Sequence, residues 1–162
     1  MAAPTKARTS ATSFELAADA FFGMQHAIAN VVRPIDNALN EAHGTNLTGY
    51  EVLLRLARMH EGGASVRYLS DQVLISPSRV SRVVDELVSR GLLERALSPQ
   101  DGRLSLVRLT AGGRDELAGM QDTFERALRS HFVAALTAEQ VEKLVDVAQS
   151  LGAPHCPPRN PS

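Results

Sequence analysis

Apolar residues recur at helical spacing along most of the chain, and this pattern predicts a mainly helical protein. The first predicted helix begins at Ser13, kinks at Pro34 and ends at Gly44. A second helix is predicted to begin at Thr48 as its cap, and a short third helix covers residues 67–74. These three segments account for the first half of the chain.

The best-defined helix follows a tight turn. Ser76 is a capping residue type, and Pro77 stands at the first helical position, where its missing N–H is not needed. Gly91 is expected to end the helix. Its apolar residues fall at i, i+3, i+4, i+7 and i+8 and form one stripe: Val80, Val83, Val84, Leu87 and Val88. The stripe leaves the rest of the helix surface polar.

Two short apolar segments then predict a β-hairpin. They cover residues 92–97 and 104–109, and the turn sequence Pro-Gln-Asp-Gly lies between them. Two more helices are predicted to begin at Thr110 and at Thr137, the latter with a capping box. Two helices joined by a tight turn and followed by a polar-tipped hairpin form a winged helix-turn-helix. The predicted fold is therefore mainly α, with six helices and a small β-hairpin wing.

Composition limits what such a chain can be. It has 162 residues, of which 44% are hydrophobic, and a formal net charge of −1. This excludes a disordered chain and favours one compact domain with a core. The longest uncharged stretch outside the tails, residues 20–32, is too short for a membrane span, which needs about 20 apolar residues. We expect no secretory signal, a cytoplasmic location and no membrane partner.

The sequence offers little chemistry for catalysis or metal binding. Cys156 is the only cysteine, and the five histidines show no paired ligand spacing. Gly-rich phosphate loops, nucleophile elbows and His-Glu-x-x-His motifs are all missing from the sequence. We therefore expect no enzyme activity, no cofactor and no metal site.

Candidate DNA-binding residues lie on the polar face of the best-defined helix. The second helix of a helix-turn-helix presents its N-terminal residues to the major groove, where arginine can bond guanine and serine can bond phosphate or a base edge. None of the residues in this position is acidic: Ser76, Pro77, Ser78, Arg79, Ser81 and Arg82. At the hairpin tip, Arg103 can enter a minor groove and Asp101 can orient it. An ordinary solvated face and a plain turn are the alternative interpretations.

These segments resemble the MarR family of transcription regulators. Residues 101–110, DGRLSLVRLT, match that family's wing pattern D-x-R-x-x-x-V-x-L-T. Residues 78–87 and 90–95 resemble its recognition helix and the start of its wing, and residues 46–53 resemble the start of its second helix. The resemblance implies a homodimer that binds a pseudo-palindromic double-stranded DNA operator and represses transcription.

The resemblance also divides the chain by role. It implies an N-terminal dimerisation helix over residues 13–47, a DNA-binding lobe over 48–110 and C-terminal dimerisation helices over 111–151. The dimer base is thus built from the terminal helices. Flexible tails are expected at residues 1–12 and, because of its prolines, at 152–162.

A small aromatic or phenolic acid is the kind of effector that the family implies, bound between the dimer base and the lobe. Helix order suggests the lining residues Gln25, His26, Ala29, Arg33 and Tyr50. Packing or solvent exposure is the alternative interpretation of each. Two other functions remain open: a winged-helix protein-interaction module, and a regulator without a small-molecule effector.

Overall fold

The computed structural model describes residues 5–59, 63–97 and 105–153, with side chains from residue 13 onward. Its helices are α1 (Thr5–His43), α2 (Leu47–Ala57), α3 (Val66–Val73), α4 (Pro77–Ser89), α5 (Ala111–His131) and α6 (Ala138–Ser150). Its strands are β1 (Leu93–Leu97) and β2 (Ser105–Leu109), and a 3-10 turn, η1 (Val133–Ala135), precedes α6. These helices and the antiparallel pair β1–β2 confirm the predicted fold class.

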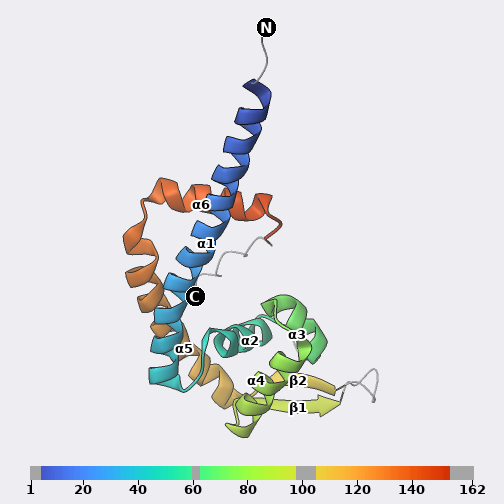
Figure 1. Ribbon diagram of the computed structural model, residues 1–162. Coiled ribbons are helices and arrows are strands. Elements are labelled where there is room, and N and C mark those ends of the chain that lie inside the picture. The colour runs from blue at the N-terminus through green and yellow to red at the C-terminus, as the bar shows by residue number, and fades with distance from the viewer. Residues whose placement is uncertain (1–4, 60–62, 98–104, 154–162) are drawn as a thin grey trace.

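Figure 1 shows a lobe formed by α2, α3, α4 and the hairpin, which we define as residues 47–109. Helix α1 rises out of this lobe and continues well beyond it, and α5 packs along the lower part of α1. We call residues 13–30 of α1 the arm; all of them except Ala18 are exposed. Helix α6 crosses α1 in this view. No helix in the described part of the chain is both long and apolar enough to cross a membrane.

The core lies where the lobe meets the lower ends of α1 and α5. The largest fully buried side chains come from all of these elements: Leu39, Leu53, Leu69, Leu87, Leu93, Met120, Val52, Val80, Val84 and Val107. Each such side chain contributes about 1.5–3 kcal/mol when it leaves water. The predicted stripe of α4 is confirmed, because three of its members are fully buried and the other two pack against the same core.

Helix α1 differs from its prediction at one end and agrees at the other. It begins at Thr5 rather than Ser13, so the predicted flexible tail over residues 1–12 is wrong from Thr5 onward; the first four residues lie outside the described part. Pro34 stands inside the helix, which continues without a break. The helix ends before Gly44, whose φ of 59° is left-handed and is readily adopted by glycine.

The start of α2 is held by two side chains, neither of which is the predicted cap Thr48. The cap is Asn46, whose Oδ1 accepts from the N–H of Gly49 at 3.0 Å. Asp36 of α1 accepts from the N–H of Leu47 at 2.7 Å. The predicted cap Thr48 is wrong because Asn46, also a residue type that caps helices, takes that role two positions earlier. The contact from Asp36 comes from another helix, which a local pattern does not reveal.

The remaining predicted boundaries agree with the structure to within about two residues, as expected for helix and strand ends. Thr110 caps α5 by accepting from Gly113 N–H at 2.9 Å, and Thr137 forms the predicted capping box with Gln140 at the start of α6. Gly113 also allows a close approach, since a methyl group there would collide with the carbonyl oxygen of Leu92. Of the predicted C-terminal tail, residues 154–162 lie outside the described residues.

Candidate nucleic-acid interface

Helix α4 has one buried and one exposed face, and the predicted DNA-binding residues lie on the exposed one. Five of the six are exposed and Ser81 is half-buried. Arg79 and Arg82 are separated by one turn and therefore project from the same side of the helix. The fully buried Val80 and Val84 fix the opposite side in the core. The structure thus brings the predicted recognition-helix residues together on one outward surface.

The first turn of α4 is open to a partner. Ser76 has the extended backbone of a capping residue, with φ −61° and ψ 147°, but its side chain caps no N–H. Its hydroxyl oxygen instead lies 3.2 Å from that of Ser78. The N-terminus of a helix carries partial positive charge and attracts anionic oxygens. A phosphate or base oxygen placed there is within reach of three kinds of hydrogen-bond donor: serine hydroxyls, arginine guanidinium groups and backbone N–H groups.

The hairpin is attached to α4 by an ion pair. Arg95 Nη2 of β1 donates to Asp85 Oδ1 of α4 at 2.6 Å. The pair is partly exposed, so its contribution to stability is about 0–1 kcal/mol. Its geometric effect is to hold the base of the hairpin beside α4. Sequence reasoning did not single out Arg95, because it lies ten positions from its partner and in a different element.

The two predicted residues at the hairpin tip, Asp101 and Arg103, lie outside the described residues. The strands leading to them are paired in register from Leu93 with Leu109 to Leu97 with Ser105. In Figure 1 both strands extend away from the helices of the lobe. The described part of the hairpin therefore begins at the core and projects outward.

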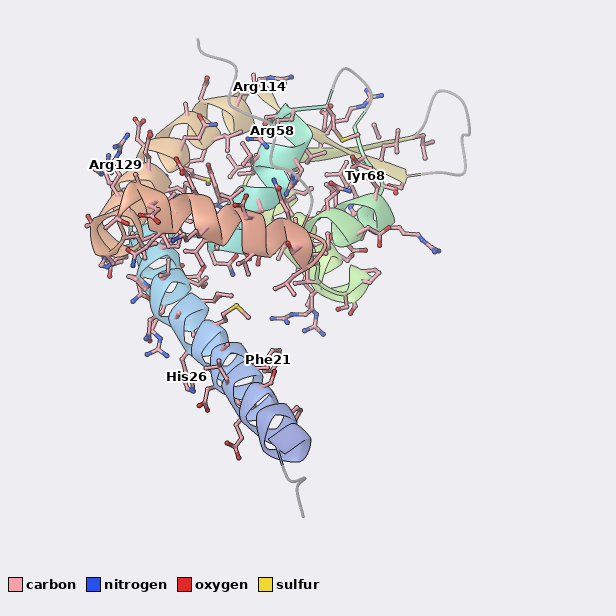
Figure 2. The ribbon with its side chains drawn as sticks, turned by 90° about the horizontal axis from the view of Figure 1, so that it is seen from above. Phe21, His26, Arg58, Tyr68, Arg114 and Arg129 are labelled. Carbon is pink, nitrogen blue, oxygen red and sulfur yellow. The ribbon has the colours of Figure 1, made fainter. Side chains whose placement is uncertain are left out.

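The five predicted effector residues do not form one pocket within a single chain of the described structure. Gln25, His26, Ala29 and Arg33 are exposed along α1, and Figure 2 shows His26 on the shaft of that helix. Tyr50 is only 3% exposed and stacks on Phe124 of α5, with ring centroids 4.9 Å apart. A groove of about 480 Å³ lies between α1 and α5 and is lined by other residues: Ala38, Glu41, Ala42, Thr123, Arg126, Ala127, Ser130 and His131.

A partly buried charge pair lies on α2, next to Tyr50. Burial raises the pKa of the Glu51 carboxyl, and the nearby Arg55 guanidinium opposes that shift. Arg55 Nε is itself buried, with no hydrogen-bond partner among the described atoms. Within the ranges that the structure covers, no three His, Cys, Asp or Glu side chains gather into a metal site. The pair is therefore a local feature of α2 without a metal cluster around it.

Comparison with known proteins gives consistent results. Residues 43–104, which include α2 to α4 and the first strand of the hairpin, match the family model of the MarR family. The HTH-type transcriptional regulator MhqR of Bacillus subtilis is 27% identical over 130 residues, which cover 77% of this chain and 86% of MhqR. MhqR is named as a transcriptional regulator and not as an enzyme.

Solved structures share most of this architecture. CouR from Rhodococcus jostii, solved with p-coumaroyl-CoA, is 27% identical with a TM-score of 0.72, covering 88% of this chain and 98% of CouR. Sco3205 from Streptomyces coelicolor, a MarR family regulator solved in complex with DNA, has a TM-score of 0.75 and covers 82% of each chain; at 23% identity it shows the shared fold alone. The sequence motifs, the winged lobe and these relatives agree, and together they support a winged-helix regulator similar to the MarR family of transcriptional regulators.

Proposed function

We propose that this protein binds double-stranded DNA through α4 and the hairpin, and that it acts as a homodimeric repressor. The observation that carries this proposal is the outward face at the start of α4. It presents Arg79, Arg82 and three serines without an acidic side chain, on a helix whose other face is fixed in the core. A rigid helix of this kind fits the major groove, where arginine can bond guanine with two hydrogen bonds.

The homodimer is supported by the apolar surface of the arm and of α6. Phe14 and Phe21 lie seven residues apart, on one face of α1, and are 75% and 53% exposed. On α6 several apolar side chains are also exposed: Leu144, Val145 and Val147. A second copy of the chain would cover these faces. It would also place two recognition helices on one side of the DNA, where a pseudo-palindromic operator needs them about 34–36 Å apart.

An effector is a further part of the proposal. CouR was solved with p-coumaroyl-CoA, a ligand built on a phenolic acid, and this supports a small aromatic or phenolic acid as the effector class here. The exposed positions Gln25, His26, Ala29 and Arg33 would line its site together with a surface from the partner, and Tyr50 would act from the core side. The ligand would release DNA if it bound the DNA-incompetent arrangement more tightly.

The test is DNA binding across a salt series, with the double-stranded DNA that the wild-type protein selects from a random-sequence pool. Arg82→Ala should weaken binding by about 1–3 kcal/mol if Arg82 contacts a base. If Arg82 contacts phosphate alone, selected and unselected DNA should lose affinity together and the salt slope should fall by about 1. Arg114→Ala, at an exposed position near the start of α5, removes the same charge and should change little.

A protein-interaction module would behave differently. Such a module would select no DNA from the pool. Alternatively, it would bind DNA weakly, and its DNA affinity would be the same in the double variant Arg79→Ala and Arg82→Ala as in wild type. Binding that does not weaken with salt would also contradict the proposal, because contacts to phosphates release counterions. A thermal-shift series with phenolic acids then separates a ligand-responsive regulator from one without an effector.

A further inference from the structure

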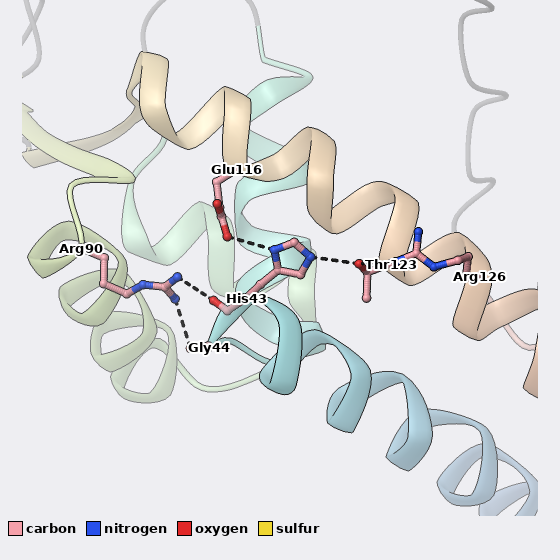
Figure 3. A network of polar contacts seen from close by, with 6 residues as sticks. All are labelled: His43, Gly44, Arg90, Glu116, Thr123 and Arg126. Carbon is pink, nitrogen blue, oxygen red and sulfur yellow. Dashed lines mark hydrogen bonds and ion pairs between the residues drawn. The ribbon is translucent and has the colours of Figure 1, made fainter.

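The C-terminal ends of α1 and α4 meet through one arginine. Arg90, the residue that follows α4, reaches 46 positions back along the chain (Figure 3). Its Nη2 donates to the carbonyl oxygen of His43 at 2.6 Å, and its Nη1 donates to that of Gly44 at 3.1 Å. The last carbonyls of a helix lack partners within the helix and carry partial negative charge. A planar guanidinium satisfies the carbonyl of His43 at the helix end together with that of Gly44 beside it, and its positive charge strengthens both bonds.

The same turn of α1 is bound to α5 through the His43 side chain. Its Nδ1 donates to Glu116 Oε1 at 3.0 Å, since a carboxylate only accepts. Its Nε2 lies 3.0 Å from the hydroxyl oxygen of Thr123, within hydrogen-bond distance, and Arg126 Nη2 donates to that same oxygen at 3.1 Å. Thr123 is only 6% exposed. The end of α1 is therefore held to α5 by the histidine ring and to α4 by Arg90 (Figure 3).

We infer that Arg90 is a positioning residue: it holds the lobe at a fixed angle to α1 and so sets the spacing of the two recognition helices in the dimer. This inference rests on the proposed DNA-binding function. The chain between α1 and α2 is a short link, residues 44–46, that begins with a left-handed glycine. Besides the shared core and the hydrogen bond from Leu47 N–H to Asp36, Arg90 forms a further tether across this link, close to the point about which the lobe would turn.

A small rotation at this point has a large effect at the DNA. Helix α4 has 13 residues and is therefore roughly 20 Å long, at about 1.5 Å per residue. Turning the lobe by about 10° around the Arg90 end would move the start of α4 by roughly 3 Å. This displacement is close to the spacing of neighbouring base pairs along DNA, which has about 10 base pairs per 34 Å. Each lobe would move, so a loss of the tether should affect the match between two half-sites more than the contacts within one half-site.

A direct contact between Arg90 and DNA phosphate is the competing explanation. The guanidinium already serves two carbonyl groups, both on the α1 side of the lobe. The two explanations give different salt responses. A phosphate contact contributes to the slope of affinity against salt, whereas a positioning residue leaves that slope unchanged.

The experiment compares Arg90→Ala and Arg90→Lys with wild type and with Arg114→Ala, which removes an equal charge from an exposed position. The probes are the DNA selected by the wild-type protein, a single half-site, and versions with one or two base pairs inserted between half-sites. Arg90→Ala should lower the affinity for the full operator about tenfold or more, which corresponds to the loss of one charge-assisted hydrogen bond. Its affinity for a single half-site and its salt slope should stay unchanged. Arg90→Lys should recover part of the loss, because an ammonium lacks the planar fork.

The inference is wrong if half-site and full-site affinities fall together, if the salt slope drops by about 1, or if Arg114→Ala has the same effect. A second measurement does not depend on DNA. Spin labels at Asn37→Cys on α1 and Arg67→Cys on α3, with Cys156→Ser, report the angle between α1 and the lobe when labelled chains are diluted with unlabelled ones. Both label positions are exposed.

The distance distribution between these labels should broaden in Arg90→Ala and be intermediate in Arg90→Lys. An unchanged distribution would overturn the inference even if the protein binds DNA. A broadened distribution in a protein that selects no DNA would support the tether and refute the proposed function. If Arg90→Ala does not fold, the lysine variant carries both measurements.

Discussion

The lobe and the arm bury their apolar residues very differently. In the lobe, Leu53, Leu69 and Val84 have no exposed surface. On the arm, Phe14 is 75% exposed and Phe21 is 53% exposed, and Figure 2 shows Phe21 on a part of α1 that stands clear of the lobe. Both regions have helices with apolar residues at regular spacing. The difference teaches that such spacing identifies an apolar helix face that must be buried. It does not show whether the same chain or another chain buries it.

The largest expected effect is in the lobe. Leu53→Ala should lower the free energy of unfolding by about 2–5 kcal/mol, because it removes a fully buried side chain and leaves a cavity. Urea denaturation followed by circular dichroism measures this change. The control is Leu97→Ala, at a position that is 66% exposed, which should stay within about 0.5 kcal/mol of wild type. An equal decrease in the free energy of unfolding in both variants would contradict the contrast between lobe and arm, because the lobe would then lack a distinct core.

The next effect should be on the arm and should appear in assembly. Phe21→Glu places a charge on the apolar face of α1, and we expect it to weaken dimerisation by at least about 2 kcal/mol, roughly 30-fold in the dissociation constant. Analytical ultracentrifugation over a concentration series measures it. The lobe should still unfold cooperatively, because its core does not include this residue.

The matched control for the arm is Asn30→Glu, an exposed position nine residues further along α1 and so on the opposite side of the helix from Phe21. It should leave the dimer intact. A wild-type protein that is monomeric at micromolar concentration would refute the view that a second chain covers the arm.

The smallest effect concerns the turn between α3 and α4. Leu74 has φ 55° and ψ 34°, a left-handed conformation that a side chain disfavours by about 1–2 kcal/mol, and it is 85% exposed. Leu74→Gly should therefore stabilise the lobe by about 0.5–1 kcal/mol after the greater freedom of glycine in the unfolded chain is subtracted. Leu74→Ala keeps the Cβ atom and should show no such gain in the same urea experiment. A loss of stability in the glycine variant would show that the exposed leucine packs after all.

The sequence predicted the lobe well because its signals are local. A proline at the first helical position, an apolar stripe at helical spacing and a turn sequence between two apolar segments all act within about 15 residues. They located α4 and the hairpin, and with them the outward face that carries Arg79 and Arg82. The capping box at Thr137 was found in the same way.

Contacts between distant segments were beyond such reasoning. Asp36 caps α2 from another helix, and Tyr50 stacks on Phe124 in the core although helix order had placed it beside an effector. Arg90 lies in a segment that resembles the start of the family's wing, but nothing near it in the sequence shows that it bonds His43. Each of these depends on how helices pack, which is decided by side chains far apart in the chain.

By itself, then, the sequence determined which segments become helices and strands, which face of α4 is buried, and the family that the chain resembles. Propensity, capping and periodicity are properties of neighbouring residues, so they can be read along the chain. Only the tertiary structure decided how the lobe is held against α1, and that the arm has no cover from its own chain within the described residues. Both depend on the burial of surfaces and the geometry of hydrogen bonds between remote groups, which exist only after the helices have packed.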